Sequence, residues 1–173
     1  MSEDFTFRVP IDRVRDGERI DLVASDADRA AILKKLDLVS IGRLEAHCAL
    51  DHHGKAVRAR GRIKAALEQA CVASGEPVPA FIDEAFEIQF QSEPTRAPDE
   101  ELELSGDDLD IVFHDGQGIE LGEAIADTLA VLIDPYPRGP NAEATLSEAG
   151  VLSEEQAGPF AALAALKGKM AEE

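Results

Sequence analysis

The sequence predicts an α+β fold in which an antiparallel β-sheet, formed by about the first 115 residues, is covered by two or three helices. Short segments of alternating apolar and polar residues, separated by glycine and proline turns, indicate antiparallel strands. Other segments carry apolar residues at helical spacing. The chain has 173 residues, a length typical of one domain. We therefore expect a single domain over residues 1–173.

The predicted strands alternate in polarity and end at turn residues. They cover residues 5–9, 19–23, 39–50, 55–71, 81–90 and 109–113. Gly54 lies between the two longest segments, and glycine readily adopts the positive φ that a tight connection requires. These two segments are therefore expected to form a hairpin, which the segment 81–90 extends to three antiparallel strands.

Two helices are expected to cover the sheet. Ser25 precedes acidic residues and an apolar pattern, so it is a plausible N-cap for a helix over residues 26–36. A stronger apolar face predicts a helix over residues 119–134, which ends at Pro135 and Pro137.

The remaining segments are expected at the periphery. Residues 91–108 combine prolines with many acids, which predicts a mobile acidic loop. A helical tail is expected over residues 141–173. It includes a short helix after Pro159 that docks through Phe160 and Leu163.

The formal net charge of −18 argues against indiscriminate binding to nucleic acid or to anionic membranes. The charge is unevenly distributed, however. Residues 1–90 carry 13 basic and 16 acidic side chains, whereas residues 91–173 carry 4 basic and 19 acidic ones. Within the first half, the segment from Arg43 to Lys64 has a net charge of +4. The acidity therefore belongs mainly to the second half.

The sequence also carries information on location. Cys48 and Cys71 are too few for a disulfide framework, and the first residues lack the features of a signal peptide. No apolar run approaches the roughly 18–20 residues that a membrane helix needs. We therefore expect a cytoplasmic protein without a membrane partner.

The best candidate site is a row of four cations on one predicted strand. Arg58, Arg60, Arg62 and Lys64 alternate with small or apolar residues, so all four project from one face at intervals of roughly 6.6–6.8 Å. Such a row suits successive phosphates of a nucleic acid. The alternative is a solvated strand face whose cations pair with acids of neighbouring strands. The acids available for this are Glu45, Asp51, Asp83, Glu84 and Glu87.

Other kinds of site find little support. Five His and Cys side chains of the central segment lack the paired spacing of a zinc site, so no metal is expected. These are His47, Cys48, His52, His53 and Cys71. Phosphate-loop, catalytic-serine and zinc-protease motifs are absent, so we expect no catalytic residue, cofactor or small-molecule substrate. Aromatic residues make up only 5% and Trp is absent, so stacking platforms for single-stranded bases are not expected.

Three stretches resemble the bacterial and plastid YceD-like proteins, a family named for accumulation of the large-subunit ribosomal RNA. Residues 68–78 (EQACVASGEPV) resemble the family's strand, C-x-x-C and proline turn. Residues 118–137 resemble its I-D-L helix and the proline segment that follows. Residues 159–167 (PFAALAALK) resemble its C-terminal N-P-F-A-x-L-x-x-L-K, the most specific of the three.

The chain departs from the family pattern at three positions. Ser74 stands at the family's second cysteine, Glu120 at its Asp, and Gly158 at its Asn. Since the change at Ser74 removes half of the C-x-x-C, no metal ligand is carried over.

The resemblance implies a non-enzymatic ribosome-biogenesis factor. It would support synthesis, processing or stability of large-subunit (23S) ribosomal RNA by binding that RNA, its precursor particle or a ribosomal protein. The row of four cations is then the best candidate RNA-facing surface. The alternative is a module that chaperones a basic partner, such as a basic ribosomal protein, through the acidic C-terminal half without contacting RNA.

Overall fold

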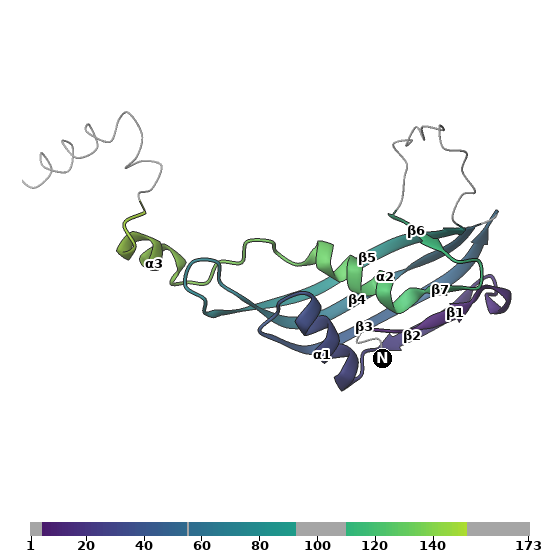
Figure 1. Ribbon diagram of the computed structural model, residues 1–173, viewed down its shortest axis with the longest axis horizontal. Coiled ribbons are helices and arrows are strands. Elements are labelled where there is room, and N and C mark those ends of the chain that lie inside the picture. Colours follow the sequence, from purple (N-terminus) through teal and green to yellow (C-terminus); the bar gives the residue numbers. More distant parts are fainter. Residues whose placement is uncertain (1–4, 55, 93–109, 152–173) are drawn as a thin grey trace, which may run out of the picture. The chain divides into compact units, whose positions relative to one another are not determined.

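The computed structural model describes residues 5–54, 56–92 and 110–151. They divide into two compact units, one within residues 1–69 and 79–135 and the other within residues 70–78 and 136–173. In chain order the elements are β1 (Arg8–Pro10), the 3-10 helix η1 (Ile11–Arg13), β2 (Glu18–Val23), α1 (Asp26–Lys35), β3 (Ser40–His53), β4 (Ala56–Ala70), β5 (Pro77–Ser92), β6 (Asp110–His114), β7 (Gly118–Glu120), α2 (Leu121–Leu132) and α3 (Ala142–Glu148) (Figure 1). The predicted α+β class is confirmed.

The larger sheet has five strands in the order β2-β3-β4-β5-β6. β3 runs antiparallel to both β2 and β4, and the predicted hairpin turns at Gly54, whose φ is +65°. β6 instead runs parallel to β5, with Gln91 opposite Phe113. The expectation of a wholly antiparallel sheet is therefore wrong at this edge.

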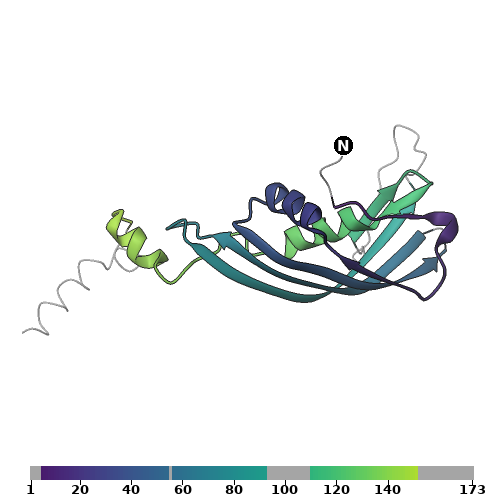
Figure 2. The ribbon, with the colours of Figure 1, turned by 90° about the horizontal axis from the view of Figure 1, so that it is seen from below.

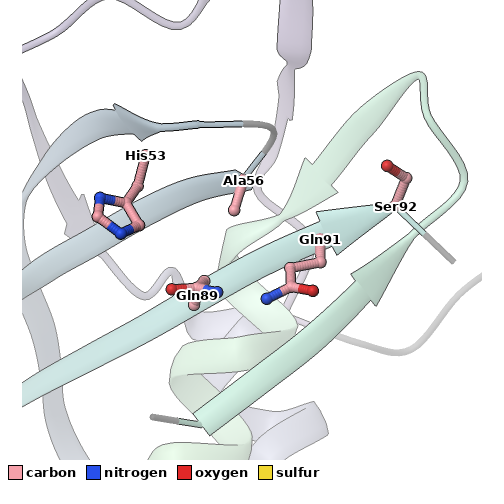
Figure 3. A pocket seen from close by; sticks show the side chains of 5 residues that line it. All are labelled: His53, Ala56, Gln89, Gln91 and Ser92. Atoms are coloured by element: carbon pink, nitrogen blue, oxygen red, sulfur yellow. The ribbon is translucent and has the colours of Figure 1, made fainter. Parts of the chain in front are cut away.

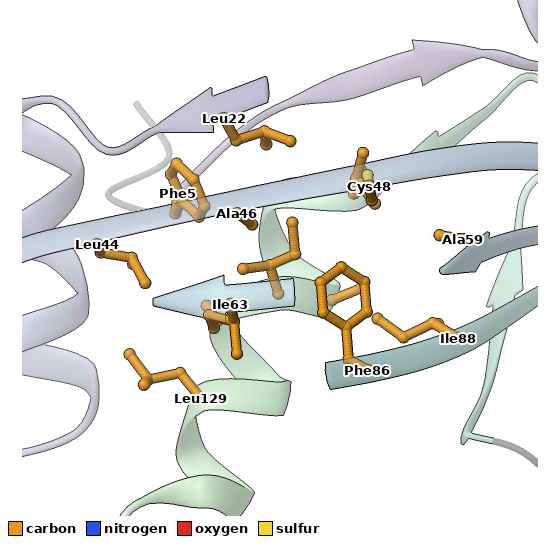
Figure 4. Close-up of a cluster of buried hydrophobic side chains, with 14 of the residues drawn as sticks. Phe5, Leu22, Leu44, Ala46, Cys48, Ala59, Ile63, Phe86, Ile88 and Leu129 are labelled. Carbon is orange, nitrogen blue, oxygen red and sulfur yellow. The ribbon is translucent and has the colours of Figure 1, made fainter. Parts of the chain in front are cut away.

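Both helices of the larger unit, α1 and α2, lie on the same face of the curved sheet (Figure 2). The core forms beneath them, from buried aliphatic side chains and a few Phe rings of the sheet (Figure 4). Ile63 of β4, Phe90 of β5 and Leu129 of α2 are all fully buried. Within the larger unit, no described helix covers the opposite face of the sheet, which we call the open face.

The capping residue of α1 is the one the sequence predicts. The Ser25 side chain accepts the backbone N–H of Asp28 over 3.2 Å, and the Asp28 carboxylate accepts the backbone N–H of Ser25 over 2.8 Å. This reciprocal pair satisfies two donors that a helix start leaves free. The predicted helix over residues 26–36 is confirmed to within one residue.

The second predicted helix begins later than expected. Residues 118–120 form β7, which pairs with β1 and places Ile119 opposite Val9, so the helix starts at Leu121. The backbone N–H groups of Leu121 and Gly122 both donate to the carbonyl of Phe7. Because Phe7 is bonded to this helix start, the first strand covers only Arg8–Pro10 rather than residues 5–9.

A glycine sets the approach of β3 to β4. A Cβ atom at Gly61 would lie 2.2 Å from the carbonyl oxygen of His47 and 2.6 Å from Cβ of Cys48. Any larger residue would therefore push the two strands apart. This glycine lies in the middle of the row of four cations and keeps their strand closely paired with β3.

The smaller unit is built on the turn that follows β4. The Cys71 backbone bonds to Glu76, and the Val72 N–H donates to the carbonyl of Pro137. Helix α3 falls within the predicted tail over residues 141–173.

Some expectations lie outside the described residues. The acidic loop, expected over residues 91–108, is one of them from residue 93 onward. Its first two residues, Gln91 and Ser92, belong to β5 instead. The docking of Phe160 and Leu163 is another. The single domain over residues 1–173 stays a prediction.

Candidate nucleic-acid interface

The four cations of β4 project from the open face. Along the strand, Val57, Ala59 and Ile63 are buried beneath the helices. The residues between them therefore point to the opposite side, as alternation along a strand requires. The sheet thus places Arg58, Arg60, Arg62 and Lys64 in one row, as the sequence predicts.

Each cation of this row lies beside an acid from a neighbouring strand. Arg58 is 3.2 Å from Glu87, and Arg60 is 3.0 Å from Asp51. Arg62 pairs with Asp83, which Lys64 also approaches, to 3.9 Å. The geometry therefore shows the cross-strand pairing that the sequence left open as the alternative. The pairing acids are Asp51, Asp83 and Glu87, whereas Glu45 pairs with Arg43.

The ion pairs perturb the acids. A hydrogen bond from Arg60 lowers the pKa of Asp51, helped by the backbone N–H of Gly17. A hydrogen bond from Arg62 lowers the pKa of Asp83, with the charge of Lys64 as a smaller cause. Both carboxylates are therefore held in the charged form by the cations beside them.

Positive charge on this row still exceeds what its partners neutralise. Four cations share three carboxylates, because Asp83 serves both Arg62 and Lys64. The buried Nε of Arg58, although close to Glu87, makes no hydrogen bond within the described residues. The excess positive charge is therefore carried by the exposed ends of Arg60, Arg62 and Lys64.

The open face carries a further cation that the sequence analysis does not single out. Arg19 of β2 lies opposite Ala49 of β3, and Ala49 lies opposite Arg60 of β4. Arg19 is exposed and has no acidic partner within the described part of the chain. Its position follows from alternation, since Ile20 and Leu22 point into the core. Arg19 and Arg60 thus lie on either side of the small Ala49 side chain, each one strand away, and neighbouring strands are about 4.8 Å apart.

A metal site of the C-x-x-C kind does not fit the residues present. The thiol sulfur of Cys71 accepts the backbone N–H groups of Gly139 and Ser74, at 3.3 and 3.4 Å. These bonds lower the pKa of Cys71 to about 6. The hydroxyl of Ser74, at the position of a second ligand, donates to Glu76 instead. Among the described residues, no group of three or more His, Cys, Asp or Glu side chains could hold a metal ion.

The other cysteine has a different environment. Cys48 is buried beneath the sheet's helical layer, and burial raises the pKa of its thiol to about 11. It behaves as a small apolar core residue. Within the described residues, the two cysteines and the histidines of the central segment therefore do not come together as ligands for a metal ion.

Comparison with known proteins identifies a family. The model of the family described as large ribosomal RNA subunit accumulation protein YceD matches residues 59–167. No curated protein and no solved structure matched the chain. No described helix is long and apolar enough to cross a bilayer. The matched region begins within the row of four cations and covers more than half of the sequence, so the chain belongs to the YceD family, whose name ties it to the accumulation of the large ribosomal RNA subunit.

Proposed function

We propose that this protein is a non-enzymatic ribosome-biogenesis factor that binds large-subunit ribosomal RNA, or its precursor particle, through the open face of its five-stranded sheet. The contact is made by Arg58, Arg60, Arg62 and Lys64, in the cytoplasm where ribosomes are assembled. The family supports the ribosomal role. The observation that carries the RNA contact is the in-register row of four cations on a sheet face that no described helix of the larger unit covers.

The ion pairs of this face are compatible with such a contact. Side chains of Arg60, Arg62 and Asp83 are each 54% exposed, and exposed ion pairs contribute only about 0–1 kcal/mol. A phosphate can therefore replace a carboxylate as the arginine's partner at small cost. Arg binds phosphate with two parallel donors, which further favours the exchange.

The same ion pairs limit the strength of non-specific binding. Acids interspersed among the cations, and the net charge of −18, repel polyanions that do not match the row. Binding is then expected only where an RNA presents phosphates to the row and keeps away from the acidic half. A selective contact is what a factor for one ribosomal RNA requires.

Ultraviolet crosslinking tests this function. Purified protein is mixed with large-subunit ribosomal RNA, irradiated and digested, and the crosslinked peptides are identified by mass spectrometry. Crosslinks should lie in β3, β4 and β5, on the open face. The triple variant Arg58→Gln, Arg60→Gln, Arg62→Gln should lose most of them.

The matched control removes the same charge elsewhere. The variant Lys34→Gln, Lys35→Gln, Arg138→Gln changes two residues of α1, on the covered side of the sheet, and one in the smaller unit. It should crosslink like the wild type. Absence of crosslinks in the wild type, together with stoichiometric binding to a purified basic ribosomal protein, would instead establish the chaperone alternative.

A further inference from the structure

A polar pocket of about 290 Å³ opens at the end of the open face. It is lined by His53, Ala56, Gln89, Gln91 and Ser92, from the ends of β3 and β5 and the start of β4 (Figure 3). Within the described residues, the side chains of His53, Gln89 and Gln91 have no hydrogen-bonding partner. Each carboxamide offers both a donor and an acceptor. The pocket therefore presents several unused hydrogen-bonding groups.

These groups share the face of the cations. Glu87 contacts Arg58 on the open face, so Gln89 and Gln91, two and four residues further along β5, point to the same side. Ile88 and Phe90, between them, are buried. The pocket therefore opens on the same face as the row of four cations.

An exposed aromatic ring lies on the strand that pairs with the pocket's edge. Phe113 of β6 lies opposite Gln91 in the parallel pairing, and paired residues share a face of the sheet. Its side chain is 51% exposed, an unusual position for Phe, because large apolar side chains are normally buried. The low aromatic content predicted no stacking platform, but this ring is placed where one can act.

Arg58 connects the pocket to the cations. It follows Ala56 of the pocket by two residues, roughly 6.7 Å along β4. Its side chain is 24% exposed beside Glu87. A nucleotide whose base enters the pocket can therefore place its phosphate beside this guanidinium.

We infer that the pocket holds one unpaired nucleobase of a bound RNA strand, stacked on Phe113 and hydrogen-bonded by Gln89, Gln91 and His53. Single-stranded RNA is commonly read in this way, by stacking on aromatic rings and hydrogen bonding to base edges. This inference rests on the proposed function, because Arg58 and Arg60 supply the adjacent phosphate contacts. It adds to that function that the bound RNA is single-stranded where it meets the pocket.

Binding of short oligoribonucleotides tests the inference. Fluorescein-labelled single-stranded RNAs of mixed sequence, and duplexes of equal length, are titrated with protein and followed by anisotropy. Phe113→Ala should weaken single-strand binding roughly tenfold and leave duplex binding unchanged. Gln91→Ala should weaken single-strand binding in the same selective way. The control Val131→Ala removes an apolar side chain of α2 that is 84% exposed on the covered side of the sheet, and it should have no effect.

A second variant reports on stacking directly. The chain has no Trp, so Phe113→Trp creates a single indole fluorophore. Single-stranded RNA should quench its fluorescence on binding, whereas duplex should not.

The outcomes separate the two proposals. If wild type binds RNA through the arginines but Phe113→Ala binds as tightly and Phe113→Trp is not quenched, the base pocket is refuted while the proposed function stands. If wild type binds neither single-stranded nor duplex RNA, both are refuted.

Discussion

Nη2 of Arg60 donates to Oδ2 of Asp51 over 3.0 Å across the β3–β4 hairpin. Asp51 also accepts the backbone N–H of Gly17 over 2.9 Å, so one carboxylate holds both the arginine and the turn before β2. The most prominent cations of the sequence are therefore not free on the folded protein. Any anion that binds them must compete with acids that the fold has placed beside them.

Neutralising Asp51 should strengthen RNA binding. Asp51→Asn keeps an oxygen for the Gly17 N–H but removes the charge that competes for Arg60. Since exposed ion pairs contribute about 0.2–1 kcal/mol, affinity for large-subunit ribosomal RNA should rise by a factor of roughly 1.4 to 5. Filter binding at fixed salt measures this.

The control for this charge change is Asp127→Asn. Asp127 of α2 pairs with Lys35 over 2.9 Å, on the covered side of the sheet. Asp127→Asn removes the same charge as Asp51→Asn and should leave the affinity for RNA nearly unchanged. Equal gains from both variants would show that only net charge matters, and would argue against a contact at Arg60.

Gly61 is predicted to be intolerant of any side chain. Gly61→Ala places a methyl group against the His47 carbonyl and Cys48, and overpacking of this kind costs typically 1–3 kcal/mol. Gly42→Ala is the matched control, because its added Cβ would meet nothing closer than 3.8 Å. Urea denaturation should show a clear loss of unfolding free energy for the first variant and a change within about 0.5 kcal/mol for the second. Equal stabilities would contradict the close approach of β3 and β4.

Arg8 should govern the acid titration of Asp115. The hydrogen bond from Arg8, reinforced by the backbone N–H of Gln117, lowers the pKa of Asp115 to about 2. A carboxylate with a lowered pKa in the folded state stabilises the fold above its unfolded pKa of about 3.9 and loses that contribution as the pH falls towards 2.

The test is an NMR titration of the Asp115 carboxyl. In Arg8→Gln the pKa of Asp115 should rise towards the unfolded value, so this carboxylate should contribute less stability and less should be lost between about pH 4 and pH 2. Arg19→Gln, which removes an arginine without an acidic partner in the described chain, should leave the titration in place. An unchanged pKa of Asp115 in Arg8→Gln would show that the pair does not form.

The two thiols should ionise at very different pH. Absorbance at 240 nm, which follows thiolate formation, should show one step near pH 6 for Cys71 and none for Cys48 below about pH 10. The low pKa of Cys71 comes first from the Gly139 N–H and then from Ser74. Cys71→Ser should remove the lower step. A single step near the ordinary thiol value of about 8.5 would contradict both environments.

The sequence predicted local features well and long-range pairing less well. Ser25 and Gly54 act through neighbours in the chain, so the capping box and the hairpin turn could be predicted from type and spacing. The parallel pairing of Gln91 with Phe113 depends on how the chain returns after residues 93–109, which spacing does not encode. The start of α2 was misplaced because Phe7, more than a hundred residues earlier, bonds to it.

The candidate site shows the same division. Alternation alone placed Arg58, Arg60, Arg62 and Lys64 on one face, because strand geometry fixes it. Their pairing with Asp51, Asp83 and Glu87 depends on the register of β3 and β5, which the sequence left open. Arg19 could have been placed by the same alternation, but its partner across the sheet, Ala49, is known only from the register.

The salt dependence of RNA binding tests the contact through the open face most directly. Affinity for large-subunit ribosomal RNA is measured over a series of salt concentrations, for the wild type and for Arg58→Gln, Arg60→Gln, Arg62→Gln. If the three arginines each contact a phosphate, the slope of log affinity against log salt should become shallower by roughly 2, at about 0.7 per single-strand contact. Parallel slopes for the two proteins would contradict an RNA contact through this face.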